Sequence, residues 1–189
     1  MTTTTTTTTT TNSAPTSTPT LPLPGACACG TIRFHLTRAP LFTHCCHCTR
    51  CQRETGTAFA LNALVERAHL ALLSPTRPVG VPVPSDSGAG QTIFRCPACY
   101  GPVWSVYGDG ANKIAYVRAG TLEGREVRPD IHIYTRSKRG WVGFGDEGVP
   151  AVEGYYDNRE YWPEASLERL RILREEGKAV GEAVGESGA

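Results

Sequence analysis

Seven of the eight cysteines in this chain fall into three short motifs whose spacings suit a metal ion. Two motifs are pairs, Cys27-Ala28-Cys29 and Cys96-Pro97-Ala98-Cys99, and the third is the triplet Cys46-His47-Cys48-Thr49-Arg50-Cys51. Thiolates at these spacings are typical zinc ligands. A zinc ion with four protein ligands is usually structural, whereas one with three keeps a position open for water or substrate. The sequence therefore predicts one closed site and one open site.

The two pairs together supply the four sulfurs of a closed site. We expect one structural zinc ion to be held by Cys27, Cys29, Cys96 and Cys99. Such an ion joins the beginning of the chain to its middle, and structural zinc contributes about 10–16 kcal/mol to the folding of zinc-finger peptides. Two unrelated thiol pairs are the alternative. Disulfides are disfavoured because no secretory signal precedes the cysteines.

The triplet can hold a second ion from a single tight loop, through Cys46, Cys48 and Cys51, with a fourth position vacant. A thiol bound to zinc is deprotonated, and zinc also polarises carbonyl oxygens as a Lewis acid. These three cysteines are the candidate catalytic residues, acting through bound zinc. The alternative is a second closed site whose fourth ligand is His44, Cys45 or His47. Binding of one ion by both Cys45 and Cys46 is disfavoured, because neighbouring side chains in an extended segment point to opposite faces.

Charged and polar residues around the triplet are candidates for binding a substrate. Arg50 and Arg53 could pair with carboxylates, since a guanidinium matches carboxylate geometry. The alternative for both is a surface position or a structural ion pair. His47 could contact the substrate and move a proton, with a structural role as the alternative. Glu54 is a more distant candidate acid or base, and we expect His132 to serve the core.

The rest of the foldable chain reads as short strands separated by glycine and proline turns. We expect strands at residues 31–36, 59–65, 68–73, 91–95, 103–107, 113–118 and 131–135, with a long loop or hairpin at 74–90. One helix is expected after Pro163, where leucines recur at helical spacing at Leu167, Leu170 and Leu173. The pattern predicts a mainly β, antiparallel body covered by a C-terminal helix.

Composition sets the predicted boundaries of the domain. Residues 1–24 include ten consecutive threonines and lack large apolar side chains between Met1 and Leu21, which predicts disorder. We expect a zinc-binding domain at 25–145, a C-terminal extension with the helix at 146–176, and a disordered tail at 177–189. Neither a secretory signal nor a membrane span is apparent, so the expected location is the cytoplasm, with the nucleus also compatible.

Charge is unevenly distributed along the chain. Residues 1–140 carry 14 lysines and arginines against 7 acidic residues, whereas residues 141–189 carry 5 against 11. A basic body suits a small anionic substrate. The alternative is that the acidic C-terminal part packs over the basic body. No dense basic stripe interleaved with aromatic residues is apparent, so nucleic acid is not an expected partner.

Taken together, the motifs resemble the glutathione-dependent formaldehyde-activating enzyme family, which includes the centromere protein V-like proteins. The matching strings are Gly25-x-Cys27-x-Cys29-Gly30, Cys46-His47-Cys48-x-x-Cys51-x-Arg53-x-x-Gly56, Cys96-x-x-Cys99, and His132-Ile133-Tyr134 followed by Trp141. The resemblance covers about residues 25–141. The cysteine spacing is highly specific as a set, although each pair alone would be a weak signal.

The resemblance implies a β-tent-like fold, in which small antiparallel sheets surround two zinc ions per chain, one structural and one catalytic. It also implies carbon–sulfur lyase chemistry on a small thiol adduct: S-hydroxymethylglutathione, formed from or broken into glutathione and formaldehyde, with glutathione as co-substrate. The alternative is a non-catalytic zinc scaffold that binds protein partners, of the centromere protein V-like type. One position departs from the family pattern, because Tyr100 stands where a glycine usually follows Cys99. If the backbone there requires a positive φ, tyrosine is strained.

Overall fold

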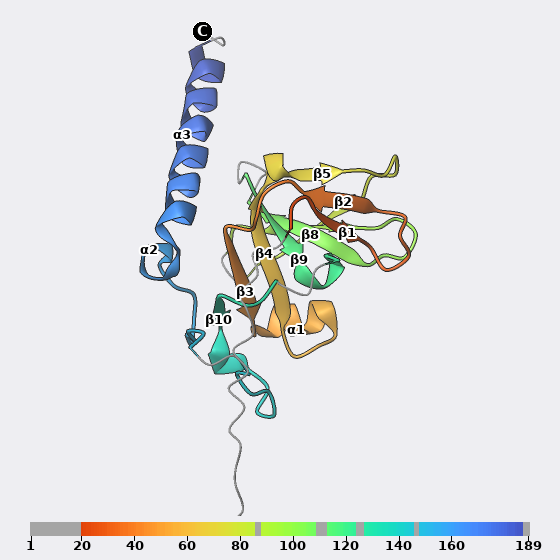
Figure 1. The fold of residues 1–189 in the computed structure, drawn as a ribbon, viewed down its shortest axis with the longest axis vertical. Coiled ribbons are helices and arrows are strands. Elements are labelled where there is room, and N and C mark those ends of the chain that lie inside the picture. Colours follow the sequence, from red (N-terminus) through yellow and green to blue (C-terminus); the bar gives the residue numbers. More distant parts are fainter. Residues whose placement is uncertain (1–19, 86–87, 109–112, 124–126, 146–147, 187–189) are drawn as a thin grey trace, which may run out of the picture.

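The computed structural model describes residues 20–85, 88–108, 113–123, 127–145 and 148–186, with side chains as far as Glu176 (Figure 1). These residues form two β-sheets, short helical turns and a long C-terminal helix, which confirms the predicted mainly β class. None of the helices described is long and apolar enough to cross a membrane. The predicted N-terminal disorder falls outside the described residues as far as residue 19.

The larger sheet has seven strands and carries the triplet. Its order is β10 (Ile131–Ile133), β3 (Phe42–Cys46), β4 (Ala60–Glu66), β9 (Ile114–Arg118), β8 (Pro102–Tyr107), β7 (Gln91–Arg95) and β6 (Val79–Val83). Neighbouring strands are antiparallel except at one edge, where β10 runs parallel to β3. The antiparallel arrangement expected from the sequence therefore holds throughout the described sheets except at this edge. The parallel pairing brings residue 132 beside residue 45, although 87 positions separate them in the chain.

The smaller sheet contains β1 (Leu23–Ala26), β2 (Arg33–Leu36) and β5 (Leu70–Leu72), all antiparallel. It packs in front of the β8 and β9 region of the larger sheet (Figure 1). The predicted alternation is confirmed, because Ile32, Phe34 and Leu36 are all fully buried in the shared core. A side chain at position 25 would lie 2.6 Å from the Phe34 ring, which explains why the chain has glycine there.

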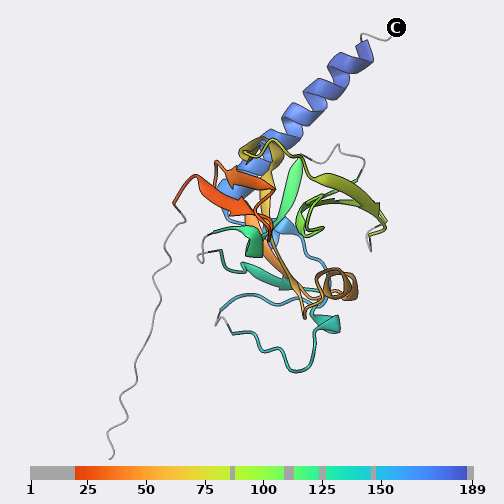
Figure 2. The same cartoon turned by 90° about the vertical axis from the view of Figure 1, so that its right-hand side faces the viewer.

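A second core lies where the C-terminal extension packs on β3. The extension contains α2 (Asn158–Tyr161) and α3 (Glu164–Glu186). Trp162 stacks on Phe42 with ring centroids 5.4 Å apart, and Leu170 is buried in the same cluster. Leu167 and Leu173 pack around that cluster, as their helical spacing predicted. The beginning of α3 lies against the sheet and the helix then extends away from it (Figure 2).

Most predicted strands are present, but three strands and two short α-helices were not predicted from the sequence. β1 contains proline and glycine, β3 was read only as a metal motif, and β6 lies at a sheet edge inside the proline-rich segment 74–90. The structure also has a short helix, α1 (Thr49–Thr55), and three turns of 3-10 helix: η1 (Arg67–His69), η2 (Ala119–Thr121) and η3 (Thr135–Ser137). α3 continues to Glu186, past Gly177, where we expected a disordered tail to begin.

Candidate metal centre and its cavity

Strand β3 separates the adjacent cysteines onto its two faces. Successive side chains of a strand point to opposite sides of the sheet. Cys46 accordingly joins the triplet, whereas Cys45 lies with His47 and His132 in another group. Cys45 is therefore not placed as a fourth ligand of the triplet, in agreement with the alternation argument.

Helix α1 positions the other two sulfurs of the triplet. We expected a tight loop, but Cys48 is the N-cap of α1, and its Sγ accepts a hydrogen bond of 3.3 Å from the backbone N–H of Cys51. Buried Gln52 fixes the helix, because its Nε2 donates to the carbonyl oxygens of His47 at 2.7 Å and Ser137 at 2.8 Å. Gly56 ends the helix with a φ of 68°, a conformation that glycine adopts without strain.

The three sulfurs fit a tetrahedral zinc ion with one position left over. They lie within 4.8 Å of one another, and sulfurs bound at the usual zinc–sulfur length stand about 3.8 Å apart. Hydrogen bonds from Cys46 and Cys51 lower the pKa of Cys48 to about 2, so the group readily holds a thiolate. Hydrogen bonding to Cys48 and Cys51, together with burial, raises the pKa of Cys46. Among the described residues, no fourth histidine, cysteine or carboxylate joins this group.

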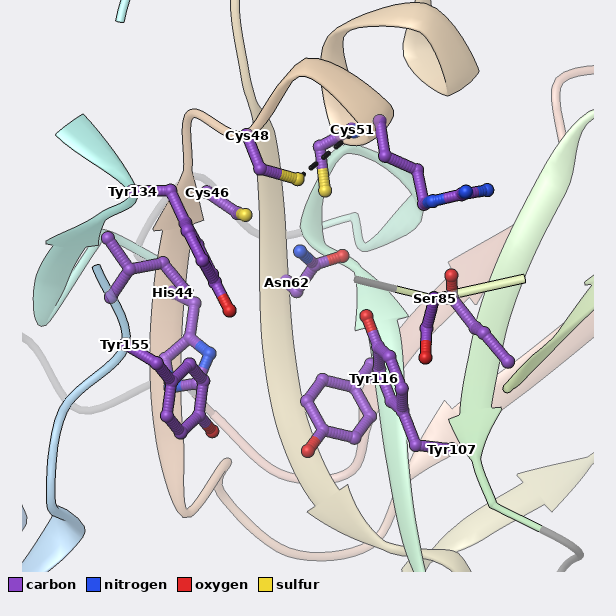
Figure 3. Close-up of a pocket in the computed structure, with 13 residues that line it drawn as sticks. His44, Cys46, Cys48, Cys51, Asn62, Ser85, Tyr107, Tyr116, Tyr134 and Tyr155 are labelled. Carbon is purple, nitrogen blue, oxygen red and sulfur yellow. Dashed lines mark hydrogen bonds between the residues drawn. The ribbon is translucent and has the colours of Figure 1, made fainter. Parts of the chain in front are cut away.

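The three sulfurs form one wall of a cavity of about 340 Å³ (Figure 3). In Figure 3, His44, Tyr134 and Tyr155 lie along one side, Tyr107 and Tyr116 along the other, and the sulfurs at one end. The remaining lining residues are Arg50, Asn62, Ser85, Gln91 and Ile133. The cavity therefore combines aromatic, sulfur and uncharged polar side chains, with a single arginine beside the sulfurs.

His44 faces this cavity in its neutral form. Burial lowers the pKa of His44 to about 3. Its Nε2 lies 2.6 Å from the Tyr156 hydroxyl, which also accepts a hydrogen bond of 2.6 Å from Trp162 Nε1. Because Trp162 can only donate, the Tyr156 hydroxyl is free to donate to His44 Nε2, and His44 then carries its proton on Nδ1. His44 is outside the sulfur group, so the structure does not place it as a fourth ligand.

A second cavity of about 320 Å³ lies on the other side of Arg50 and Cys51. Arg50, Arg53, Arg95 and Arg118 line it with a single carboxylate, Glu54. Glu54 accepts hydrogen bonds from Arg95 at 2.7 Å and from Arg118 at 2.6 Å. This pairing gives Glu54 a structural role and makes it a poor candidate acid or base. The cavity keeps an excess of positive charge, which suits an anion.

His47 lies away from both cavities. Its side chain is fully buried, and its Nε2 is 3.0 Å from Nδ1 of His132. This position supports the structural alternative for His47 and gives no support to the predicted substrate contact. Arg50 and Arg53, in contrast, both line the positively charged cavity beside the triplet, as a carboxylate-binding role requires.

The four remaining predicted ligands converge between the two sheets. Cys27, Cys29, Cys96 and Cys99 lie within 4.8 Å of one another, and the sulfurs of Cys29 and Cys96 are 3.7 Å apart. These donors fit a closed structural zinc site. Hydrogen bonding to Thr31 lowers the pKa of Cys29 to about 6, which favours the thiolate that a metal requires.

The turn at Cys96-Pro97-Ala98-Cys99 has the strained backbone at Tyr100 that the sequence suggested. Tyr100 has a φ of 59°, and its N–H donates to the carbonyl oxygen of Cys96 at 2.9 Å. The turn is otherwise regular, with the Ala98 N–H donating to Cys96 Sγ at 3.4 Å. The departure from glycine therefore changes the strain of the turn and leaves the ligand positions intact.

Sequence reasoning missed most of the cavity wall. The wall includes the four tyrosines Tyr107, Tyr116, Tyr134 and Tyr155, and the buried polar residues Asn62 and Gln91. A signal was present for the last two, because a buried amide within an apolar strand needs a hydrogen-bonding role. No sequence signal joined the tyrosines. Tyr107 and Tyr116 come from β8 and β9, Tyr134 follows β10, and Tyr155 belongs to the C-terminal extension.

Comparison with known proteins agrees with the motifs. The model of the family described as glutathione-dependent formaldehyde-activating enzyme matches residues 22–137. The chain belongs to this family. A search of curated protein sequences finds no match. A similar solved structure is that of a protein from Rhodobacter sphaeroides, which is 18% identical, with a TM-score of 0.41; the match covers 68% of this chain and 99% of that chain.

Proposed function

We propose that the protein is a zinc-dependent carbon–sulfur lyase that acts on a glutathione adduct such as S-hydroxymethylglutathione. The observation that carries the proposal is the convergence of Cys46, Cys48 and Cys51 on the wall of an open cavity, without a fourth protein ligand among the described residues. A closed second site would favour the non-catalytic scaffold instead. Membership in the family is consistent with the glutathione chemistry.

Two zinc ions per chain belong to the proposal. The four-cysteine group would hold the structural ion, and the triplet would hold the second. When bound at the triplet, zinc would favour the thiolate form of a substrate thiol and polarise a carbonyl oxygen. Because the triplet sulfurs come from β3, the N-cap of α1 and its first turn, their positions are set by backbone structure.

The chain's own residues would bind and orient the adduct across the two cavities. Arg50 and Cys51 line both cavities, so a thiol beside Cys51 has guanidinium groups within reach of its peptide carboxylates. Arg50 and Arg53 would pair with those carboxylates. The uncharged cavity would receive the carbon that becomes the aldehyde.

Proton transfer accompanies the making and breaking of the carbon–sulfur bond. In the forming direction, the thiolate sulfur attacks the carbonyl carbon and the carbonyl oxygen takes up a proton. In the reverse direction, the adduct hydroxyl loses its proton, the carbonyl reforms and the thiolate leaves. Tyr134 points its hydroxyl into the cavity near the sulfurs, and His44 lines the same wall in its neutral form (Figure 3). Both side chains offer hydrogen bonds to the oxygen that changes charge.

The proposed setting is a reducing compartment such as the cytoplasm, with a small-molecule thiol adduct as the partner. All eight cysteines are free thiols in the structure. Reduced cysteines bind zinc after losing their protons, and the reduced state persists where glutathione is reduced.

A Cys48→Ser variant tests the proposal most simply. The variant loses one triplet sulfur, so we expect turnover of glutathione and formaldehyde, followed by NMR, to fall at least about 100-fold. Circular dichroism should show an unchanged fold, because the four-cysteine group is intact. Turnover equal to that of the parent protein would overturn the lyase proposal.

An Arg53→Ala variant tests the glutathione arm separately. Losing a hydrogen bond to a charged group costs about 1.5–3 kcal/mol, so the KM for glutathione should rise about 10-fold to 100-fold while kcat changes little. Arg171→Ala is the matched control, because Arg171 lies on the exposed face of α3 with 56% of its side chain accessible. Equal KM values in both variants would contradict the assignment of Arg53.

A further inference from the structure

A third cluster of potential ligands lies behind the triplet, on the opposite face of β3. It consists of Cys45, His47 and His132, whose ligand atoms all lie within 4.8 Å of one another. Cys45 Sγ is 3.6 Å from His47 Nε2, which is 3.0 Å from His132 Nδ1. All three side chains are buried, with exposed fractions of 3%, 0% and 6%. Neither the lyase proposal nor the structural zinc site uses this cluster.

Backbone pairing places these three side chains together. Cys45 and His132 are direct partners in the parallel register of β3 and β10. His47 follows Cys45 by two positions and keeps the same face, and its N–H donates to the carbonyl oxygen of Ile133 at 2.9 Å. The arrangement therefore follows from sheet geometry, which keeps the donors in place before any ion arrives.

Aromatic rings enclose the cluster on its outer side. The Phe59 ring centroid is 5.6 Å from that of His47, and the Phe144 centroid is 4.6 Å from that of His132. Phe59 and Phe144 are 38% and 42% exposed, so the cluster lies beneath a thin apolar cover. Lys138 Nζ lies 5.2 Å from the centroid of the Phe144 ring. The site is thus dry, close to the surface and next to a positive charge.

We propose that Cys45, His47 and His132 form a third metal site, and that the site selects copper as Cu(I). One thiolate and two imidazoles are the donor set of trigonal copper sites in proteins. Zinc held by three protein ligands takes water or substrate as its fourth ligand, and the burial of this cluster beneath Phe59 and Phe144 disfavours such a ligand.

Charge favours the monovalent ion over a divalent one. A thiolate and a Cu(I) ion sum to zero, whereas a divalent ion would leave a net positive charge buried beside Lys138. Burying an uncompensated charge costs several kcal/mol. The distances are close to those of such a site, because nitrogen and sulfur ligands at the lengths they have around zinc would stand roughly 3.5–3.7 Å apart in a trigonal arrangement. The pair at 3.6 Å matches this range, and the pair at 3.0 Å needs to open slightly.

The test is an anaerobic titration of the zinc-loaded, full-length protein with Cu(I), with zinc release followed by an indicator dye. We expect one equivalent of Cu(I) to bind without releasing zinc, and copper X-ray absorption to show one sulfur and two nitrogen neighbours. Cys45→Ser and His132→Gln should each weaken binding of this equivalent at least about 100-fold, because each removes a ligand and the loss of a residue that only supports a ligand already costs about 10–100-fold.

Cys46→Ser is the matched control. This variant lacks a triplet sulfur but keeps the whole third cluster, so it should still bind the Cu(I) equivalent with the same sulfur and nitrogen shell. The proposal is overturned if copper enters only as zinc leaves and shows an all-sulfur shell in the parent protein. That spectroscopic result does not depend on how well the variants fold, and it would leave Cys45, His47 and His132 as a hydrogen-bonded polar cluster only.

Discussion

At the scale of single residues, the site depends on side chains that lie in unusual surroundings. Cys48 serves both as a metal-ligand candidate and as the N-cap of α1, so ligand position and helix start are set together. A thiolate at a helix N-terminus is stabilised by the helix dipole. His44 is held neutral in the cavity wall by burial, and a hydrogen bond to Tyr156 fixes its ring. Each of these residues is positioned by main-chain structure or by a second side chain.

Tyr100 carries the clearest testable strain. It has a φ of 59° and is 72% exposed, so its side chain contributes little packing. A left-handed conformation costs a non-glycine residue about 1–2 kcal/mol. Replacement by glycine removes this strain, but glycine also loses more conformational entropy on folding, which offsets part of the gain. We expect Tyr100→Gly to raise the free energy of unfolding of the zinc-loaded protein by about 0.5–1 kcal/mol in a denaturant titration. Tyr100→Ala is the control and should give no gain, because alanine keeps the Cβ. A destabilised glycine variant would argue against strain at this turn.

At the scale of elements, α3 is joined to the sheet by a buried ion pair as well as by leucines. Arg169 donates to both oxygens of Glu66 at the end of β4, at 2.8 and 2.6 Å. Ser166 adds a hydrogen bond of 2.7 Å to the carbonyl oxygen of Leu41. The helix thereby covers the face of β3 and β4 next to the cavity wall.

Replacing Glu66 should loosen α3 in a pH-dependent way. Burial is the largest single influence and alone would raise the pKa of Glu66, but the hydrogen bonds from Arg169 and from the backbone, together with the charges of Arg169 and His69, lower the pKa overall. The stabilisation is therefore present above the unfolded-state pKa of Glu, about 4.3, and is lost as pH falls through the lower folded-state value. We expect Glu66→Gln to lose about 1–3 kcal/mol at neutral pH, measured by thermal unfolding. The difference from the parent protein should shrink below about pH 4.

A matched control lies on the same helix. Glu168 pairs with Arg171 on the exposed face of α3, where the two side chains are 52% and 56% accessible. Exposed pairs contribute little, so Glu168→Gln should leave the stability almost unchanged. Equal effects of the two substitutions, or a Glu66 effect that does not depend on pH, would contradict this account of how α3 is held.

At the scale of the whole molecule, the four-cysteine group ties together two parts of the chain that are distant in sequence. Cys27 and Cys29 follow β1 of the smaller sheet, and Cys96 and Cys99 connect β7 and β8 of the larger one. An ion there would fasten the two sheets along their shared core. The triplet, in contrast, lies at the cavity and joins only β3 to α1.

Removing the two groups should therefore have different consequences. Cys96→Ser is expected to unfold the domain, because structural zinc contributes about 10–16 kcal/mol in peptide systems and a typical domain is stable by about 5–15 kcal/mol. Circular dichroism and limited proteolysis would report the loss of structure, with Cys48→Ser as the folded control. A Cys96→Ser protein that unfolds as cooperatively as the parent would show that this ion is dispensable.

The parts of the site that could be predicted from the sequence are those formed by residues close together in the chain. The sulfur groups could be read from the sequence because each motif spans only a few residues and metal chemistry restricts the spacing. Helix α1 could not be predicted in this way. Only Gln52 of its seven residues is buried, and apolar residues do not recur in it at helical spacing. The tyrosine wall and the pairing of Cys45 with His132 depend on strand register and on a parallel edge, which short-range patterns do not specify.

Cadmium NMR of the metal-substituted protein tests the central claim most directly, because each group of sulfurs gives its own resonance. The account predicts that added glutathione shifts the resonance of the site formed by Cys46, Cys48 and Cys51 to that of a four-sulfur shell. The four-cysteine resonance should stay in place. The account would be contradicted if the cadmium resonance of the triplet already indicated four protein ligands and did not shift at saturating glutathione.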